Sequence, residues 1–556
     1  MNNNNYLKNI FANALKKLFP NSETNFDNLD FTFDIPKNPE HGDLSTNICM
    51  RLAKPLQTNP RNLASEILEN LNFDKELIEE IVLAGTGFIN IKFTTKYYQH
   101  QLKEMSLKGN NYGKTFGQND ENKGKKVNVE YVSANPTGLL HLGHGRNAAI
   151  GDTLANLYEW TGWSVTREYY FNNAGNQMTN LTRSIYARMM QILKDENFPF
   201  PEDGYHGDYV KTIAEELVAL HKDSLIQATV KDLEAIKKFG EEWCFDKIKH
   251  TLKRMSIEQD IFYNEDSLYK DGKIKQVLAE FAEKKLSYEK DGAIWLSLSK
   301  LGLEDDRVIV KSSGEPTYRL PDMAYHREKL LRGYDLVVDL FGADHIATVP
   351  DVLAGVKALG FDAKKVKVVI HQFVTLTENG EQVKMSKRTG KSYTLDELLD
   401  DVGEDVVRFF LIMRGVNTHL EFDLALAKEQ NDKNPVFYLQ YAHARISSIF
   451  EKIKEDNIDF SVADLGLLVN PAEINLIKQL ILFPSSIQLA ANKSEPQILC
   501  EYLREVASAF HLFYHNCRII GADIELMKSR LFLSNITKIV IHNGLKILGI
   551  SRPEKM

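Results

Sequence analysis

The chain has 556 residues, of which 43% are hydrophobic and 26% charged, a composition that excludes a disordered chain, a fibre and a disulfide scaffold. At roughly 100–200 residues per domain, this length predicts three or four domains. The formal net charge is −8, from 76 Asp+Glu against 68 Lys+Arg. This acidic balance argues against a nucleic-acid partner without excluding one, because phosphate binding usually shows as a basic excess.

Cysteine usage and the N-terminus indicate a reducing compartment. The four cysteines lie far apart without a CxxC pair, which predicts reduced thiols and neither a disulfide framework nor an all-cysteine zinc site. The first residues lack the basic start and apolar core of a signal peptide. The sequence holds no uninterrupted apolar run of about 18 residues, so we expect no membrane span and a cytoplasmic location.

The first hundred residues have the pattern of a small α/β domain. Apolar residues recur at helical spacing over 6–19 and 62–71, and strand-like runs follow at 80–84 and 88–93. We therefore expect a domain over 1–110. The stretch 109–126 is rich in Gly, Asn and Lys and is typical of a linker.

A second domain, expected over 111–433, opens with the strand, loop and helix of a nucleotide-binding α/β unit. These three elements are predicted at 127–133, 135–138 and 143–160. The sequence predicts a Rossmann-like α/β fold with a helical insertion at about 175–310. It also predicts buried strands at 334–341 and 365–374, and a helix that starts near Thr394.

The last part of the chain, 434–556, shows almost no strand signal. Apolar residues recur there at spacings of three and four, which predicts an all-α bundle. From Arg504 to Met556 eight Lys/Arg stand against four Asp/Glu, so this segment is basic although the whole chain is acidic. A net charge averages over unlike faces.

The first candidate for chemistry is His141-Leu142-Gly143-His144, after a predicted strand and at the start of a helix. Backbone N–H groups and the helix dipole favour an anionic phosphate there, and two histidines three residues apart can face one phosphoryl group. Gly143 leaves room for an adenine ring against the backbone. In isolation, an HxGH sequence more often supplies capping or packing histidines. A zinc site lacks a third ligand nearby.

The second candidate is the segment from Lys384 to Lys391, which carries four cations in eight residues. A loop of this kind can close on a triphosphate and neutralise the charge on leaving pyrophosphate. Alone, a basic loop is usually a solvated surface loop.

Taken together, the two motifs resemble the HIGH and KMSKS signatures of class I aminoacyl-tRNA synthetases in order and in spacing. The flanking sequence is similar to arginyl-tRNA synthetases of the bacterial form over essentially the whole chain. The matching segments are 42–47, 129–146, 168–177, 201–209, 316–318, 322–326, 342–345, 434–445 and 553–556. Arg388 stands where the KMSKS signature has a second serine, as in a common variant.

The resemblance implies that the chain activates L-arginine with ATP and Mg²⁺, then transfers arginine to tRNA(Arg). It implies that tRNA is needed even for activation, and that the enzyme is a monomer without a metal site of its own. The implied catalytic residues are His141, His144, Lys384 and Lys387. The implied ATP-binding residues are Pro136, Thr137, Gly138, His141, Gly143, His144, Met385 and Ser386.

The implied arginine-binding residues are Glu130, Ser133, Asn135, Tyr318, Asp322 and His345. A planar, permanently charged guanidinium requires carboxylates in fork geometry, and Asp322 is the preferred candidate for that contact. Tyr318 and Asp322 are four apart and would project from one side of a helical turn, although a capped surface helix would explain both equally well. Some family members carry Gln where His345 stands.

The resemblance makes the C-terminal bundle an anticodon-binding domain and the N-terminal domain a second tRNA contact. Loop bases typically stack on aromatic or arginine planes, and the expected contacts are Tyr441, Arg445 and Met556. For the other candidates, core packing is the better reading; these are Tyr438, Phe510, Tyr514 and Arg518. His511, His515 and Cys517 look metal-like on one helix, but Cys517 is rotated away from the histidines.

Three alternatives remain open at the sequence level: a synthetase for another amino acid, a small-molecule nucleotidyltransferase, and a catalytically dead tRNA-binding relative. The pocket residues oppose the first. The long helical C-terminal part opposes the second. Intact His141, His144, Lys384 and Lys387 oppose the third.

Overall fold

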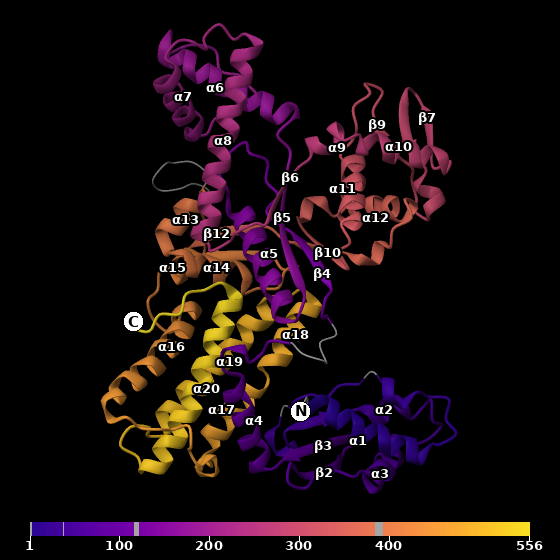
Figure 1. The fold of residues 1–556 in the computed structure, drawn as a ribbon, viewed down its shortest axis with the longest axis vertical. Coiled ribbons are helices and arrows are strands. Elements are labelled where there is room, and N and C mark those ends of the chain that lie inside the picture. Colours follow the sequence, from indigo (N-terminus) through magenta and orange to yellow (C-terminus); the bar gives the residue numbers. More distant parts are fainter. Residues whose placement is uncertain (1–2, 30, 37, 116–121, 384–392) are drawn as a thin grey trace. The chain divides into compact units, whose positions relative to one another are not determined.

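The computed structural model describes residues 3–29, 31–36, 38–115, 122–383 and 393–556. The chain divides into two compact units. Unit 1 comprises Met1–Asn110, Glu451–Ile481 and Ala509–Ile539, and unit 2 comprises Asn111–Phe450, Leu482–Ser508 and Val540–Met556. Figure 1 shows the chain coloured along its sequence.

The N-terminal part of unit 1 is a three-stranded antiparallel sheet in the order β1-β3-β2, with helices α1 to α4. The bounds are α1 Asn3–Leu18, β1 Leu44–Thr46, α2 Ile48–Leu52, α3 Pro60–Asn70, β2 Ile78–Ala84, β3 Phe88–Phe93 and α4 Thr95–Lys108. The Asn59 side chain accepts from Arg61 N and Pro60 is the first helical residue, so α3 has both sequence signals of a helix start. The predicted α/β pattern of this segment is confirmed.

Unit 1 also contains α17 (Pro471–Ile481) and portions of two long helices, α19 (Gln497–Asn516) and α20 (Ile524–Leu548). Within this unit the fully buried Glu473 carboxylate accepts from Arg530 Nε at 2.7 Å. In the described part of the chain, one stretch, Pro471–Lys493, is long and apolar enough by composition to cross a membrane, with a mean hydropathy of 1.2. That stretch folds as two helices, α17 and α18 (Phe483–Lys493), rather than as one.

The centre of unit 2 is a five-stranded, all-parallel sheet in the order β11-β10-β4-β5-β6. The bounds are β4 Lys126–Glu130, β5 Ser164–Phe171, β6 Ile261–Asn264, β10 Leu336–Gly342 and β11 Val366–His371. Four of the five residues of β4 are buried, as expected for a central parallel strand covered on both faces. In the sheet, β4 lies between β5, which is the next strand along the chain, and β10. The strand order therefore reverses between β4 and β10.

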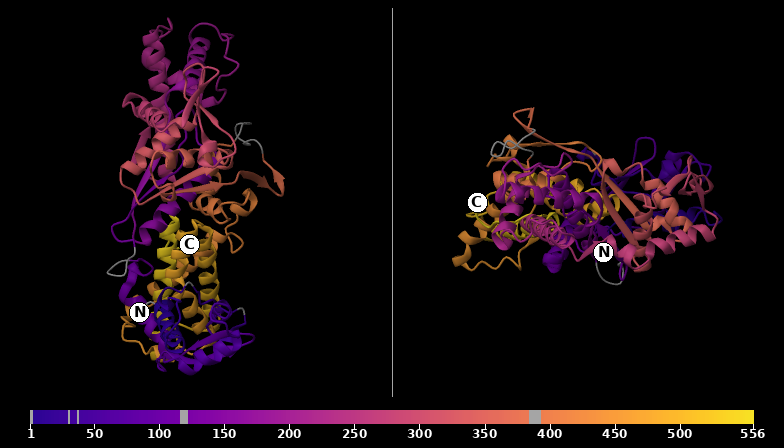
Figure 2. Two further views of the ribbon diagram at one scale, coloured as in Figure 1. Left: turned by 90° about the vertical axis from the view of Figure 1, so that its right-hand side faces the viewer. Right: turned by 90° about the horizontal axis from the view of Figure 1, so that it is seen from above.

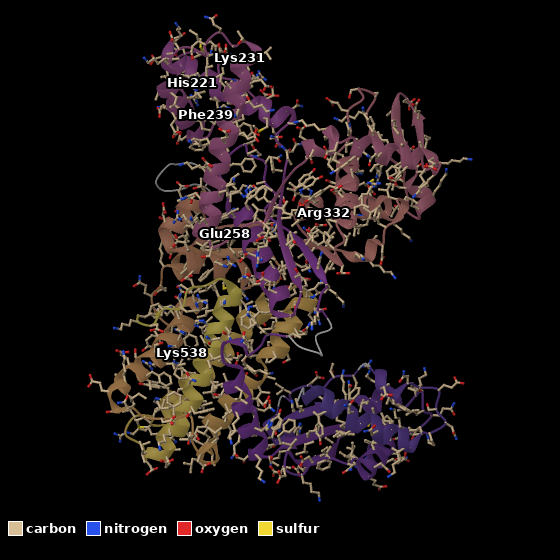
Figure 3. All side chains as sticks on the ribbon, in the orientation of Figure 1. His221, Lys231, Phe239, Glu258, Arg332 and Lys538 are labelled. Carbon is tan, nitrogen blue, oxygen red and sulfur yellow. The ribbon has the colours of Figure 1, made fainter. Side chains whose placement is uncertain are left out.

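Three helices form a lobe after β5: α6 (Gly175–Leu193), α7 (Asp208–His221) and α8 (Val230–Arg254). Figures 1 and 2 show these helices packed against one another, and Figure 3 labels Phe239 on α8, which packs on the core of this lobe. The lobe has its own buried core from Met178, Leu181, Ile185, Met189, Val210, Ile213, Ala214, Leu217, Leu225, Ile236 and Cys244.

In the segment expected as a single helical insertion at about 175–310, the helical lobe ends at Arg254. Strand β6 then returns to the parallel sheet, and a second subregion follows. It contains α9 (Asp266–Lys270), α10 (Lys273–Glu283) and an antiparallel sheet of β7 (Ser287–Lys290), β8 (Ala293–Leu296) and β9 (Arg307–Val310). Strands of only four residues are too short to give a period-2 signal that separates them from the helical stretch.

The remaining elements of unit 2 complete the framework of the sheet. They are α5 Leu142–Trp160, α11 Arg319–Leu331, α12 Val349–Ala358, β12 Val374–Glu378, β13 Glu381–Gln382, α13 Leu395–Val402, α14 Glu404–Ile412, β14 Leu420–Asp423 and α15 Leu424–Ala427. Helix α16 (Pro435–Lys452) starts the helical C-terminal part, in which α16 to α20 follow one another without an intervening strand in the described residues. The predicted fold class, a Rossmann-like α/β domain flanked by a small α/β domain and an all-α bundle, is confirmed.

Candidate functional site

A pocket of about 670 Å³ opens at the carboxyl edge of the parallel sheet. Its lining comes from the residues that follow each strand and from the first turns of α5 and α11. This position, where the strand order reverses, is where open α/β sheets bind ligands. The pocket gathers the following predicted residues: Glu130, Ser133, Asn135, His141, Gly143, His144, Tyr318, Asp322 and His345.

The two histidines stack at the N-terminus of α5, with ring centroids 3.7 Å apart. The Nδ1 atom of His141 accepts from Gly143 N at 3.1 Å, and His144 Nδ1 accepts from His141 N at 3.4 Å. These contacts form a reciprocal capping box. Because both Nδ1 atoms accept hydrogen bonds, each neutral ring carries its proton on Nε2, where it can serve as a donor to a ligand.

The histidine pair is uncharged in the free protein at neutral pH. Burial lowers the pKa of His141, and burial together with His141 and His371 lowers the pKa of His144 to about 3. A charged phosphate brought to this helix start would meet two neutral donors and the positive end of the helix dipole.

Arg146, one turn further along α5, is a fully buried cation. Its guanidinium donates to Gln372 O at 2.7 Å and to Gly415 O at 3.0 Å. The described residues place no carboxylate in ion-pair contact with it, and burial lowers its pKa to about 10. Arg146 thereby fixes the turn between β11 and β12, which carries Phe373, a pocket residue whose side chain is 62% exposed.

Two of the pocket carboxylates, Asp322 on α11 and Glu265 directly after β6, have no cation in ion-pair contact among the described residues, whereas the exposed Asp344 lies beside His345. Burial raises the pKa of Asp322 to about 7, with Glu130 and Glu265 adding to the shift. Burial also raises the pKa of Glu265, although Tyr170 donates to its carboxylate at 2.8 Å. Both groups therefore favour a cationic ligand in the pocket.

Glu130, another carboxylate of the pocket lining, is already paired. The fully buried ammonium group of Lys329 donates to it and, at 2.5 Å, to Asp339. His326 Nε2 lies 2.8 Å from the other Asp339 oxygen. Burial would raise the pKa of Asp339, but Lys329 and His326 bring it well below its usual range.

Glu168 on β5 closes the same buried network. Arg332, which Figure 3 labels, donates to both of its carboxylate oxygens at 2.8 Å, and Tyr325 donates at 2.6 Å. Burial would raise the pKa of Glu168, but these partners lower it. The described carboxylates of the network thus have cationic partners of their own, in contrast to Asp322 and Glu265.

The loop after β4 differs from the prediction of a strand over 127–133, since β4 ends at Glu130. Ser133 Oγ donates to Glu130 at 3.0 Å and accepts from Tyr170 N at 3.1 Å. Asn135 uses both ends of its amide, because Oδ1 accepts from Asn172 N at 2.9 Å and Nδ2 donates to Gln177 at 2.7 Å.

Tyr318 is the residue that precedes α11, and its side chain is 85% exposed at the pocket. His345 stacks on Phe341, with ring centroids 5.4 Å apart, and is exposed beside Asp344. Pro136, Thr137 and Gly138 are not among the residues that line the pocket. Tyr209 of the helical lobe instead donates to Thr137 O at 2.7 Å.

The second motif lies outside the described residues, including Lys384, Met385, Ser386, Lys387 and Arg388. Its flanks are described on both sides. The strand β13 ends just before it, and Thr394 just after it forms an antiparallel bridge with His141. Leu395 N also donates to Leu140 O at 2.8 Å. The flank that follows the segment is therefore attached to the start of α5 at the pocket.

Of the candidates for nucleobase contact, Tyr441 and Arg445 lie on α16 and Met556 lies after the last helix. On α16 the Arg445 guanidinium lies over the Tyr441 ring, 4.5 Å from its centroid, and Tyr441 stacks on Phe437. Met556 is 53% exposed at the C-terminus. Phe510 and Cys517 are buried, and the described residues include no group of three or more His, Cys, Asp or Glu arranged to hold a metal ion.

Glu265 is the pocket carboxylate that sequence reasoning missed. It follows a four-residue strand, and nothing in its neighbours distinguishes it from Asp266, which pairs with Lys270 at 2.5 Å. The available signal was topological: a carboxylate directly after a strand of a parallel sheet lies at the ligand-binding edge. Recognition of Ile261–Asn264 as a strand of that sheet would have identified it.

Comparison with protein families gives three matches along the chain. A class I tRNA synthetase (R) catalytic domain matches residues 106–413. An arginyl-tRNA synthetase N-terminal domain matches 5–93, and a DALR anticodon-binding domain matches 439–556.

Curated relatives and a solved structure agree with these matches. The arginine–tRNA ligase of Salinibacter ruber is 46% identical over 95% of this chain and 96% of its own length. That of Desulfotalea psychrophila is 47% identical over 95% of both chains. The arginyl-tRNA synthetase structure from Thermus thermophilus superposes with a TM-score of 0.78 at 21% identity and covers 99% of both chains, which shows a shared fold.

Proposed function

The chain belongs to the arginyl-tRNA synthetase family of class I synthetases and is an arginine–tRNA ligase of translation, and from this premise we propose how its pocket activates arginine. The observation that carries the proposal is that one pocket holds a neutral histidine pair at a helix N-terminus and two carboxylates without cationic partners among the described residues. The first suits a phosphate and the second suits a guanidinium.

At the arginine end, Asp322 and Glu265 bind the guanidinium. A planar fork of N–H donors is matched by carboxylates approaching from two sides, and each charge-assisted hydrogen bond is stronger than a neutral one. Tyr318, exposed at the entrance, covers the bound side chain. The α-amino and carboxylate groups lie toward Ser133, Asn135 and His345. A lysine ammonium would leave part of this acceptor set buried and unpaired, which disfavours lysine.

At the ATP end, His141 and His144 donate from Nε2 to the α-phosphate. An oxygen of the arginine carboxylate attacks the α-phosphorus of ATP. The bond from that phosphorus to the oxygen bridging the β-phosphate breaks, pyrophosphate leaves, and arginyl-adenylate is formed. The neutral donors stabilise the extra negative charge on the equatorial oxygens. Gly143 leaves room for the nucleoside, and Pro136, Thr137 and Gly138 support that loop from outside the lining.

Lys384 and Lys387, with Met385 and Ser386 between them, hold the pyrophosphate side. Support for this assignment is the attachment of the flanking residue Thr394 to His141. The ligase is ATP-dependent. We place Mg²⁺ on the ATP phosphates rather than on a protein cage, since magnesium usually keeps several waters and binds through substrate phosphates.

tRNA(Arg) binding by the DALR domain belongs to this function. We propose that Tyr441 and Arg445 present a stacking plane to a loop base and that Met556 adds an apolar contact. The N-terminal domain is assigned to a second tRNA contact. We further propose a monomer in the cytoplasm, and that tRNA stimulates arginine activation.

One experiment tests the assignment. Aminoacylation of tRNA(Arg) is measured with each standard amino acid, followed by ATP–pyrophosphate exchange with and without tRNA. We expect charging by arginine alone and exchange that depends on tRNA. Charging by another amino acid would refute the pocket assignment, and exchange unaffected by tRNA would refute the tRNA requirement.

A further inference from the structure

The loop that leaves β4 is strained next to the arginine end of the pocket. Val132 has a φ of +68° and Ser133 a φ of +44°, both in the left-handed region that non-glycine residues seldom adopt. Ser133 N donates to Tyr131 O at 3.0 Å, so Val132 is the central residue of a three-residue γ-turn. For a β-branched residue this conformation is costly and persists only where the surroundings enforce it.

One side chain, Asn147 on α5, meets this turn from the helix. Its Oδ1 accepts from Val132 N at 2.6 Å, and the side chain is buried. The helix also approaches the turn closely at Gly151, where an added Cβ would lie 2.3 Å from Tyr131 Cγ. Helix α5 thus contacts the turn at several positions, and among the described α5 residues Asn147 is the one whose side chain hydrogen-bonds to the strained Val132.

The other end of the Asn147 amide reaches the two neighbouring strands. Its Nδ2 donates to Leu340 O in β10 at 3.0 Å and to His371 Nε2 at the end of β11 at 3.2 Å. His371 Nδ1 consequently carries the proton, which points to Gln372 O at 3.3 Å. A single buried amide therefore connects the ends of three adjacent strands on which both halves of the pocket are built.

We propose that Asn147 is a positioning residue for arginine activation: it holds the strained Val132 turn, which places Ser133 and Asn135, and it fixes the β11 end that carries His371. This inference rests on the proposed use of the pocket. Asn147 lines the pocket, and its three side-chain hydrogen bonds all go to the protein, which assigns it to positioning rather than to the reacting atoms. Loss of the amide should release the strained turn and misplace pocket groups. Misplacement of this kind typically lowers the rate of reaction by about 10- to 100-fold.

The chain offers a matched control on the same helix. Asn156 also makes three side-chain contacts, accepting from Arg167 at 2.7 Å and donating to Ile547 O at 2.9 Å and to Asp152 at 3.2 Å. It does not line or adjoin the pocket. Asn156→Ala should lower the melting temperature and leave the KM values for arginine and ATP unchanged.

The test uses the full-length enzyme in ATP–pyrophosphate exchange with tRNA, with active sites titrated and folding checked by circular dichroism. Asn147→Ala should raise the KM for both arginine and ATP. Asn147→Asp keeps the acceptor for Val132 N and loses the two donors, one of which fixes His371, an electrostatic neighbour of His144 in the pocket, so it should raise mainly the KM for ATP. If Asn147→Ala fails to fold, the KM values of Asn147→Asp still test whether Asn147 is a positioning residue.

A rescue experiment addresses the strain itself. Glycine at position 132 adopts a positive φ without penalty. Adding Val132→Gly to Asn147→Ala should therefore lower the raised KM for arginine at least tenfold. Unchanged KM values in folded Asn147→Ala and Asn147→Asp, or equal effects of Asn156→Ala, would overturn the proposal. Absence of arginine charging by the wild-type enzyme would instead refute the proposed function.

Discussion

The ammonium group of Lys329 neutralises Glu130, so a carboxylate that lines the arginine pocket already has a cationic partner inside the protein. Lys329 itself is fully buried and does not line the pocket. Burial raises the pKa of Glu130 even so, because Asp339 and Glu168 add negative charge nearby. Glu130 therefore acts as part of the pocket frame, while Asp322 and Glu265 supply the charge that a guanidinium needs.

Replacement of Lys329 tests this division. Lys329→Met should lower the free energy of unfolding by about 3–5 kcal/mol, because Glu130 would lose its buried cation and Asp339 would keep only His326. Urea unfolding followed by circular dichroism measures the loss. Adding Asp339→Asn removes one of the two buried carboxylate charges and should restore part of the lost free energy of unfolding. Equal stability of Lys329→Met and wild type would contradict the ion-pair network.

Arginine affinity should depend on pH through Asp322. Its pKa near 7 in the free enzyme lies above the ordinary value, so the group is increasingly protonated below pH 7. The charges that face it are Glu130, Glu265, Lys329 and His326. Because the guanidinium binds the ionised form, the dissociation constant for arginine should rise as pH falls from 8 to 6, approaching about tenfold per unit below the pKa.

The same shift fixes the sign of its stability effect. A carboxyl whose folded pKa exceeds its unfolded pKa favours the folded state when protonated, so this contribution is present in acid and is lost as pH rises through about 7. Asp322→Asn should remove both trends between pH 6 and 8. Calorimetric titration with arginine provides the measurement, and an Asp322→Asn variant with an unchanged pH slope would exclude Asp322 as the titrating group.

Glu265 should matter for arginine and not for ATP. Glu265→Gln keeps the shape and the contact with Tyr170 but removes a charge, and loss of a charged hydrogen bond costs about 1.5–3 kcal/mol, or about 10- to 150-fold in the KM for arginine. The adjacent Asp266 pairs with Lys270 outside the pocket, so Asp266→Asn is the matched control. A larger effect of Asp266→Asn than of Glu265→Gln on steady-state exchange would reverse the assignment.

The sequence predicted the elements that carry strong periodicity and failed where the signal was topological. The first motif and its helix α5 were predictable because a Gly-rich loop followed a β-rich run, and the helix has bounds within a residue of those expected. The strand β6 was not, because four residues after a long polar helix carry no distinctive pattern. Because β6 was not predicted from the sequence, the division of the 175–310 segment and the position of Glu265 in the pocket were both missed.

Local strain was equally invisible in the sequence. Val132 has high strand propensity and ends, with Ser133, a β-rich run, which predicted a strand to residue 133. In the structure, tertiary contacts from Asn147 and Tyr170 override that propensity and turn the chain at Tyr131. Lys329 was missed for a related reason: a lysine at the polar spacing of a helix is normally solvated, and only the meeting of β4, β10 and α11 buries it.

The histidine pair should act through neutral donors. His141→Ala should lower the rate of arginine activation by about 10²–10³-fold, the size expected when one preorganised donor to a transition-state oxygen is lost. Because burial lowers the pKa of both rings, the activation rate at saturating arginine should stay flat between pH 7 and 8.5. His221→Ala, at an exposed position in the last turn of α7, should leave the rate unchanged. Pyrophosphate exchange near the wild-type rate in His141→Ala would show that the phosphate does not bind at the start of α5, because that helix offers its donors through this pair.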